Sequence, residues 1–157
     1  MIDPNLHYRI ATLNAEYARA IDDDRLEAWP ELFLERCLYK VTTADNHGKG
    51  LEAGIIYAES RAMLQDRVSA LRKANIYERQ RYRHVLGLPA ILAQEADVVR
   101  SESPFLIARI VRDGHTDLFA TGRYIDRIAV HAGELKFVER IVVCDSARFD
   151  TLVALPL

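Results

Sequence analysis

The sequence predicts an α+β fold in which helices pack on the concave face of a curved, mainly antiparallel sheet. Helical spacing of apolar residues dominates the first half of the chain, whereas residues 81–145 have the pattern of strands and are rich in Val, Ile, Phe and Tyr. Pro104 and Gly122 lie inside these strands, where a bulge or bend lets a sheet curl. Only the helices can cover the concave face, so we expect an open cone with an apolar interior.

The first helix is expected to begin at Pro4. Asp3 suits the N-cap position, and proline suits the first helical position because its missing N–H has no partner there. An apolar stripe at helical spacing follows, formed by Leu6, Ile10, Leu13, Tyr17 and Ile21. The pattern predicts a helix with one buried face.

A second helix is expected after the acidic run of residues 22–24. Asp24 and Glu27 have the spacing of a capping box, which favours a helix start. Pro30 removes one internal hydrogen bond, so we expect a kink or two short pieces.

The rest of the chain alternates between the two patterns. Residues 37–42 read as a strand, 45–50 as a polar loop, and 57–74 as a third helix. Hairpin turns are expected at Asp113-Gly114 and Ala132-Gly133, where glycine supplies a positive φ. An antiparallel meander then comprises residues 81–92, 98–112, 116–130 and 135–145. This order of elements is that of the NTF2-like (cystatin-like) fold, which we expect to form one domain over residues 1–157.

Composition narrows the class of protein. The 157 residues suit one domain, half of them are hydrophobic, and the mean hydropathy of -0.09 indicates a soluble chain. A net charge of -2 disfavours a nucleic-acid partner, and no apolar run approaches the roughly 18 residues that a membrane span needs. Cys37 and Cys144 are far apart and lie in no CxxC pattern, which argues against a disulfide scaffold or a cysteine-rich zinc site, and a cytoplasmic protein is expected.

Histidine spacing offers no metal site, but His84 is a candidate for chemistry. The five histidines fall at no short ligand spacing. Strand alternation places Tyr82, His84 and Leu86 on one face of a strand, with Arg81 and Arg83 on the other. His84 is then either a general base in a pocket or a hydrogen-bonded histidine at a rim or interface, and we favour the second interpretation.

Arginines are concentrated in the predicted sheet. A phosphate site is one interpretation, but the carboxylates nearby are numerous enough to pair with these guanidinium groups across strands. Arginine is also enriched at protein interfaces. We therefore favour cross-strand ion pairs or a subunit interface. Arg81 and Arg83 are assigned to the subunit interface.

The C-terminal residues 152–157 contain no polar side chain, so this segment is expected to be buried. Pro156 cannot donate a hydrogen bond to a sheet, which favours packing across an apolar surface that lies partly on a neighbouring subunit. The expected interface residues are Arg81, Arg83, His84, Leu152, Leu155 and Leu157.

Several segments together carry a family resemblance. They are Tyr17–Asp22, Trp29-Pro30, Phe33, Tyr39, Met63–Arg67, Arg81–His84, Phe119–Tyr124, Asp126, Glu139–Val143, Asp145-Ser146 and the end of the chain from Asp150. In their order and spacing the chain resembles, over essentially its whole length, the small (beta) subunits of bacterial aromatic-ring-hydroxylating dioxygenases.

The resemblance implies a non-catalytic NTF2-like subunit. A large (alpha) subunit would hold the Rieske [2Fe-2S] cluster, the mononuclear Fe(II) and the substrate, with electrons arriving from NADH through a reductase. The implied reaction is cis-dihydroxylation of an aromatic carboxylate such as terephthalate, in an assembly of three alpha and three beta subunits. The sequence agrees, because neither Cys37 nor Cys144 has a histidine two residues on, as a Rieske centre requires.

Two other functions compete with this one. A stand-alone NTF2-like isomerase or dehydratase would use His84 and Tyr39 with Asp24 or Asp45. A binding module for small aromatic molecules would use the same interior. Both need an open cone, and neither is tenable if that interior is filled by Tyr17, Trp29, Phe33 and Tyr39.

Overall fold

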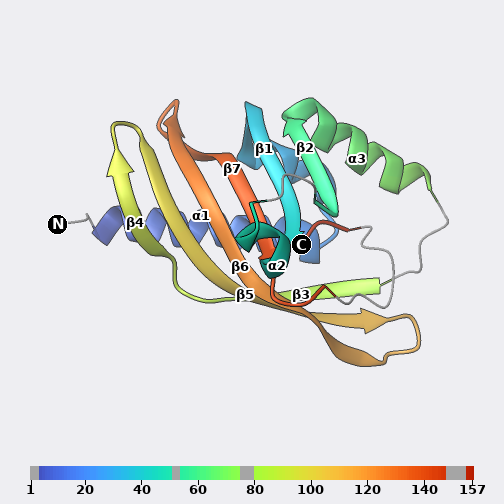
Figure 1. The fold of residues 1–157 in the computed structure, drawn as a ribbon. Coiled ribbons are helices and arrows are strands. Elements are labelled where there is room, and N and C mark those ends of the chain that lie inside the picture. The colour runs from blue at the N-terminus through green and yellow to red at the C-terminus, as the bar shows by residue number, and fades with distance from the viewer. Residues whose placement is uncertain (1–3, 51–53, 75–79, 148–154) are drawn as a thin grey trace.

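The computed structural model describes residues 4–50, 54–74, 80–147 and 155–157 (Figure 1). Its elements, in chain order, are α1 (Pro4–Asp22), the 3-10 segments η1 (Leu26–Ala28) and η2 (Pro30–Leu32), β1 (Phe33–Thr43), α2 (Ala44–Gly48), β2 (Ile56–Ser60), α3 (Arg61–Lys73), β3 (Gln80–Leu86), β4 (Ala90–Glu95), β5 (Val98–Val111), β6 (Thr116–His131) and β7 (Glu134–Cys144).

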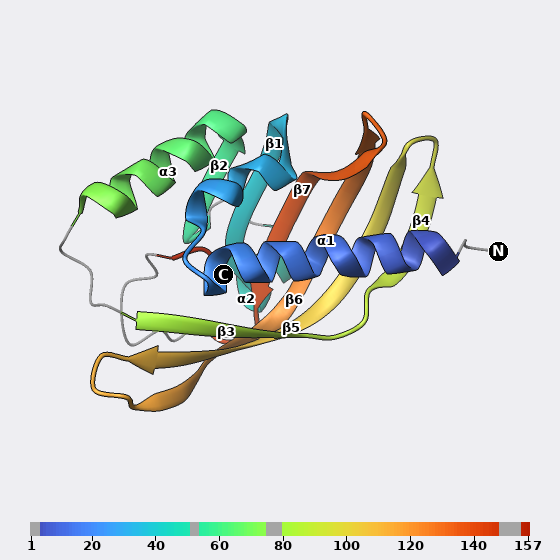
Figure 2. The same ribbon diagram turned by 180° about the vertical axis from the view of Figure 1, so that it is seen from behind.

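The strands of the described residues form one curved sheet. Its strand order is β2-β1-β7-β6-β5-β3, and β4 also pairs with β5. β1 runs parallel to β7, whereas the other neighbours are antiparallel. Figure 2 shows α1 lying across the strands on one face, with α3 beside β1 and β2. The predicted α+β, NTF2-like architecture is confirmed.

The acidic turn after α1 differs from the prediction. Pro30 does divide the second helical stretch into two short pieces, η1 and η2. Asp24, however, adopts a φ of 58° and is not an N-cap, and the N-cap position of η1, Arg25, makes no side-chain capping bond. Asp24 and Glu27 instead each bind Arg72 of α3 at 2.8 Å. A single 3-10 turn offers few free backbone N–H groups, so the two carboxylates bind the guanidinium group of Arg72 instead.

The predicted third helix is wrong over its first turn, which forms strand β2. Ile56 and Ala58 are buried while Tyr57 between them is 47% exposed, which is the alternation of a strand. The helix begins after Ser60, whose hydroxyl accepts a hydrogen bond from the Met63 N–H at 3.2 Å.

The expected polar loop contains a helical turn. Residues 44–48 form α2, and the hydroxyl of Thr43 accepts a hydrogen bond from the Asn46 N–H at 3.2 Å. The threonine therefore caps a helix too short to show a repeating apolar pattern.

The expected strand over residues 81–92 is divided, because Pro104 on β5 lies opposite the break. Proline has no N–H to donate to a neighbouring strand. Its carbonyl instead accepts a hydrogen bond from the Gly87 N–H at 2.9 Å. β3 and β4 therefore pair with separate parts of β5.

Gly122 permits a close approach between β6 and β7. A β-carbon at this position would collide with the Val143 carbonyl oxygen and lie 2.9 Å from the ring of Phe105. The register shift between β5 and β6 falls at Ile107–Ala108, so the expected bulge is not at Gly122 itself.

We expect Gly122→Ala to lower the free energy of unfolding by about 1–3 kcal/mol, because a backbone oxygen has to move to make room. Urea unfolding measures the change. Gly48→Ala is the matched control, because open space surrounds Gly48 and an alanine there should be neutral or slightly stabilising. Equal unfolding midpoints for Gly122→Ala and the parent chain would contradict this account.

Candidate functional site: the interior of the cone

Large aromatic side chains are buried together in the interior of the cone. Tyr17 of α1, Trp29, Phe33 and Tyr39 of β1 each have 0% exposure. Trp29 meets Tyr39 edge to face at 5.1 Å between ring centroids. Phe137 of β7 extends the cluster, at 5.2 Å from Phe33. These contacts are typical of a packed core.

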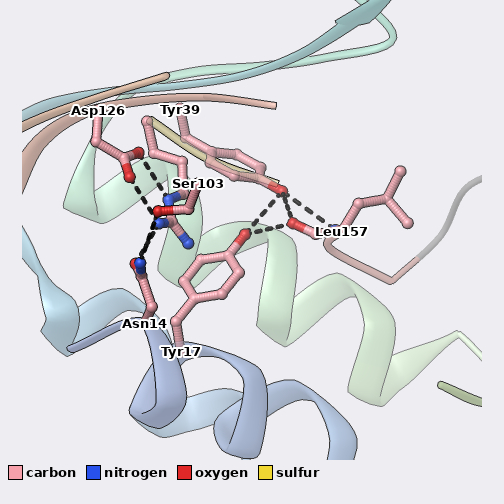
Figure 3. A network of polar contacts seen from close by, with 7 residues as sticks. Asn14, Tyr17, Tyr39, Ser103, Asp126 and Leu157 are labelled. Atoms are coloured by element: carbon pink, nitrogen blue, oxygen red, sulfur yellow. Dashed lines mark hydrogen bonds and ion pairs between the residues drawn. The ribbon is translucent and has the colours of Figure 1, made fainter. Parts of the chain in front are cut away.

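Leu157 is part of this interior. Leu157 has 0% exposure, and its carbonyl oxygen accepts hydrogen bonds from the hydroxyl groups of Tyr17 at 2.5 Å and Tyr39 at 3.2 Å (Figure 3). Leu155 is also buried and belongs to the same hydrophobic cluster. Both leucines are therefore buried by their own chain, and their burial does not require a neighbour.

His84 is paired with the last residue of α1. Its Nδ1 lies 2.6 Å from Oδ1 of Asp22, and its backbone N–H donates to Oδ2 at 2.8 Å. The two side chains are 0% and 4% exposed, so the pair ties the end of α1 to β3. The Nε2 atom of His84 is buried and has no hydrogen-bond partner among the described residues.

The carboxylates named for a catalytic site do not gather around His84. Asp24 binds Arg72, and Asp45 is exposed on α2. Asp22 is the partner instead, although it lies 62 residues away in sequence. A hint was present, because Asp22 follows the stripe Leu13, Tyr17, Ile21 by one position, near the buried face of α1.

One arginine is buried between the sheet and α1. Arg140 on β7 lies directly opposite Asp126 on β6, and its Nε and Nη2 each donate to that carboxylate at 2.8 Å. Nη2 also donates to Oδ1 of Asn14 on α1 at 2.5 Å, and Asn14 donates in turn to the Ser103 hydroxyl at 3.1 Å (Figure 3). One guanidinium thus connects two strands and a helix.

Three aromatic rings enclose the same guanidinium. Its carbon lies 3.9 Å from the ring centre of Tyr124, 4.1 Å from Phe137 and 4.3 Å from Tyr17. Burial opposes the charged form, but the carboxylate of Asp126 holds the pKa of Arg140 above its ordinary value. The charge is therefore retained in the core, where it is paired with the carboxylate and shielded by the rings.

Sequence reasoning placed the arginines of the sheet, Arg140 among them, in cross-strand ion pairs or at a subunit interface, and did not place Arg140 in the core. The signal was its alternation with Val142 and Cys144, which are also buried. A register shift in the β6–β7 pairing changes which alternate residues of β7 are buried. The alternation that includes Phe137 therefore does not continue to Arg140.

The predicted cross-strand ion pairs are present on β5, β6 and β7. Arg109 pairs with Asp117 at 2.8 Å, and Arg123 with Glu102 at 2.7 Å. Arg81 and Arg83 are exposed on the outer face of β3, opposite the face that carries His84, as the alternation predicts. Leu152, the remaining expected interface residue, lies outside the described residues.

Both cysteines are buried free thiols. Burial, and to a smaller extent the carboxylate of Asp145, raises the pKa of Cys144 to about 12. Within the described residues, no group of three or more His, Cys, Asp or Glu side chains could hold a metal ion, so the donor sets of a Rieske centre or a mononuclear iron do not fit there. In the same residues, no helix has both the length and the apolarity that crossing a membrane requires.

Comparison with known proteins places this geometry in a family. The sequence pattern of the ring hydroxylating beta subunit family matches residues 16–151. The chain belongs to that family. This beta subunit is 52% identical to the terephthalate 1,2-dioxygenase terminal oxygenase component subunit beta 1 of Comamonas sp over 149 residues, which cover 95% of this chain and 97% of the relative.

Two further similarities support the assignment. The beta subunit is 35% identical to the anthranilate 1,2-dioxygenase small subunit of Burkholderia cepacia over 155 residues, covering 99% of this chain and 96% of the relative. A solved beta subunit assigned to an aromatic-ring-hydroxylating dioxygenase of Novosphingobium aromaticivorans superposes with a TM-score of 0.89, at 38% identity and 97% coverage of each chain. The family resemblance read from the sequence is confirmed.

Arg140→Ala should lower the free energy of unfolding by about 3–5 kcal/mol, because it leaves the buried carboxylate of Asp126 without its partner. Urea unfolding of the two chains measures the loss. Arg127→Ala is the control: its side chain is 51% exposed and lies 3.8 Å from Glu139, so about 0–1 kcal/mol is expected. Similar losses for the two variants would show that the buried pair contributes no more to stability than an exposed pair does.

Proposed function

We propose that this beta subunit is a structural, non-catalytic component of an aromatic-ring-hydroxylating dioxygenase. The observation that supports this most strongly is the packing of the interior: large aromatic side chains and Leu157 are buried there together, and a stand-alone enzyme would need that interior for its substrate. Within this interior the hydroxyls of Tyr17 and Tyr39 bind Leu157. Such a subunit contributes assembly and not chemistry.

The proposal assigns the redox chemistry to a large alpha subunit. That partner would hold the Rieske [2Fe-2S] cluster, the mononuclear Fe(II) and the substrate site, and NADH would supply electrons through a reductase. Three alpha and three beta subunits would assemble in the cytoplasm. Support comes from the relatives, one of which is a subunit of a terminal oxygenase component.

An aromatic carboxylate is the proposed substrate class of the complex. The two named relatives belong to dioxygenases of terephthalate and anthranilate, which are both benzene rings bearing a carboxylate. Terephthalate is the preferred member because that relative is the more similar of the two.

The subunit interface is proposed to include the outer face of β3. This strand lies at the end of the sheet order. Every second residue points to its exposed face, which carries Arg81, Arg83 and Val85. Val85 is 57% exposed, so the face combines guanidinium groups with apolar surface, as protein interfaces commonly do. Leu152 remains assigned to this interface. His84, Leu155 and Leu157 would support it only by packing inside the subunit.

Charge reversal of Arg81 and Arg83 together is expected to weaken subunit association, because guanidinium–carboxylate pairs across the interface become repulsive. Analytical ultracentrifugation should then show a smaller species, and less large subunit should co-purify. Reversal of Lys49 and Lys73, which are exposed just after α2 and at the end of α3, makes the same change in net charge away from β3. An unchanged assembly for the arginine variant, with native circular dichroism, would remove β3 from the interface.

One observation favours a second function, a stand-alone isomerase or dehydratase. The His84–Asp22 pair has the geometry of a base oriented by a carboxylate, and its Nε2 is unpartnered. That function requires the interior to be open to a substrate, which the position of Leu157 opposes.

His84→Ala in the complete dioxygenase complex separates the two functions. The structural role predicts turnover per assembled iron centre within a fewfold of the parent, because His84 only ties α1 to β3. Loss of a general base costs roughly a hundredfold or more. A loss of that size at unchanged iron content, and absent from the exposed control His115→Ala, would assign catalysis to this chain.

A further inference from the structure

Leu157 is held in the cone in the manner of a bound ligand. Its side chain is buried in the hydrophobic cluster, and its backbone makes three hydrogen bonds to two tyrosine side chains. Tyr17 and Tyr39 donate to its carbonyl oxygen, and the hydroxyl of Tyr39 accepts from its N–H at 3.2 Å. Figure 3 shows both hydroxyl groups converging on this one residue.

The two tyrosines form a recognition site for an N-acylated amino acid. Burial raises the pKa of Tyr17 and Tyr39, so both phenols stay protonated and able to donate at neutral pH. Their hydroxyls also lie 3.3 Å apart, which fixes them as a pair. A ligand that places one carbonyl oxygen between them and one N–H on Tyr39 satisfies the pair, whereas a purely apolar molecule does not.

A second polar group faces the same interior cluster. The ring of His84 lies edge-on to that of Tyr17, at 6.5 Å between centroids, and its side chain has no exposure. Asp22 binds Nδ1, and Nε2 has no hydrogen-bond partner among the described residues. A buried polar atom without a partner beside a tyrosine pair is rare in a core built only for packing.

We propose that the cone is a ligand site that this chain fills with its own Leu157, and that an N-acyl-leucine compound binds there when residues 155–157 are removed. The site accepts an isobutyl-sized apolar group together with an amide, and Tyr17 and Tyr39 determine this specificity. In the intact chain the attached leucine competes at high effective concentration and excludes free compounds.

The test uses a chain that ends at Ala154 and the free peptide acetyl-Leu-Pro-Leu, with binding measured by isothermal titration calorimetry. The truncated chain is expected to bind this peptide, and the intact chain is expected to show no binding under the same conditions. Acetyl-Leu-Pro-Gly, which lacks the final side chain, should bind at least about tenfold more weakly, because burial of a leucine side chain is lost. Tyr39→Phe in the truncated chain should also weaken binding, because two of the three hydrogen bonds disappear.

Circular dichroism covers the case in which truncation unfolds the chain. Acetyl-Leu-Pro-Leu is then expected to restore the native spectrum, and acetyl-Leu-Pro-Gly is expected to fail at the same concentration. Equal effects of the two peptides, or neither binding nor refolding with the leucine peptide, would overturn the proposal. Because none of these measurements involves the large subunit, they can fail while the proposed structural function holds.

Discussion

The buried charge of Arg140 constrains the whole cone. An arginine removed from water is tolerable only where a carboxylate and further acceptors surround it, and here Asp126 and Asn14 supply them. These partners come from β6 and α1, so satisfying one side chain fixes the position of the helix relative to the sheet. The rings of Tyr17, Tyr124 and Phe137 then close around the guanidinium and exclude water.

This arrangement links the core to the proposed function. Tyr17 packs on Arg140 and donates to Leu157, so the tyrosine that shields the buried charge also holds the end of the described chain inside the cone. A second link at the end of α1, between Asp22 and His84, fixes the helix to β3. A body locked in this way suits a subunit that supports a catalytic partner, because substrate binding inside it would require these contacts to separate.

Local signals in the sequence predicted the local structure well. The stripe of α1 and the turns at Gly114 and Gly133, with φ of 92° and 80°, follow from residues close together in sequence. Strand β2 was missed because five residues merge into the following helical pattern, and the strand forms by pairing with β1. Partners distant in sequence were also missed. Alternation gives the face of His84, but only the fold brings Asp22 to it, and only the fold takes Asp24 to Arg72.

Hydrogen exchange at the Arg140 guanidinium tests most directly whether this buried charge holds the cone together. Its Nε–H donates to Asp126 in a site without solvent exposure, and it can be followed by nitrogen-15 NMR after transfer to heavy water. The account predicts protection equal to that of the most protected amides of β6 and β7, because exchange would require global unfolding. Exchange of this proton within minutes, while those amides stay protected, would show that the guanidinium is accessible and that the core does not depend on it.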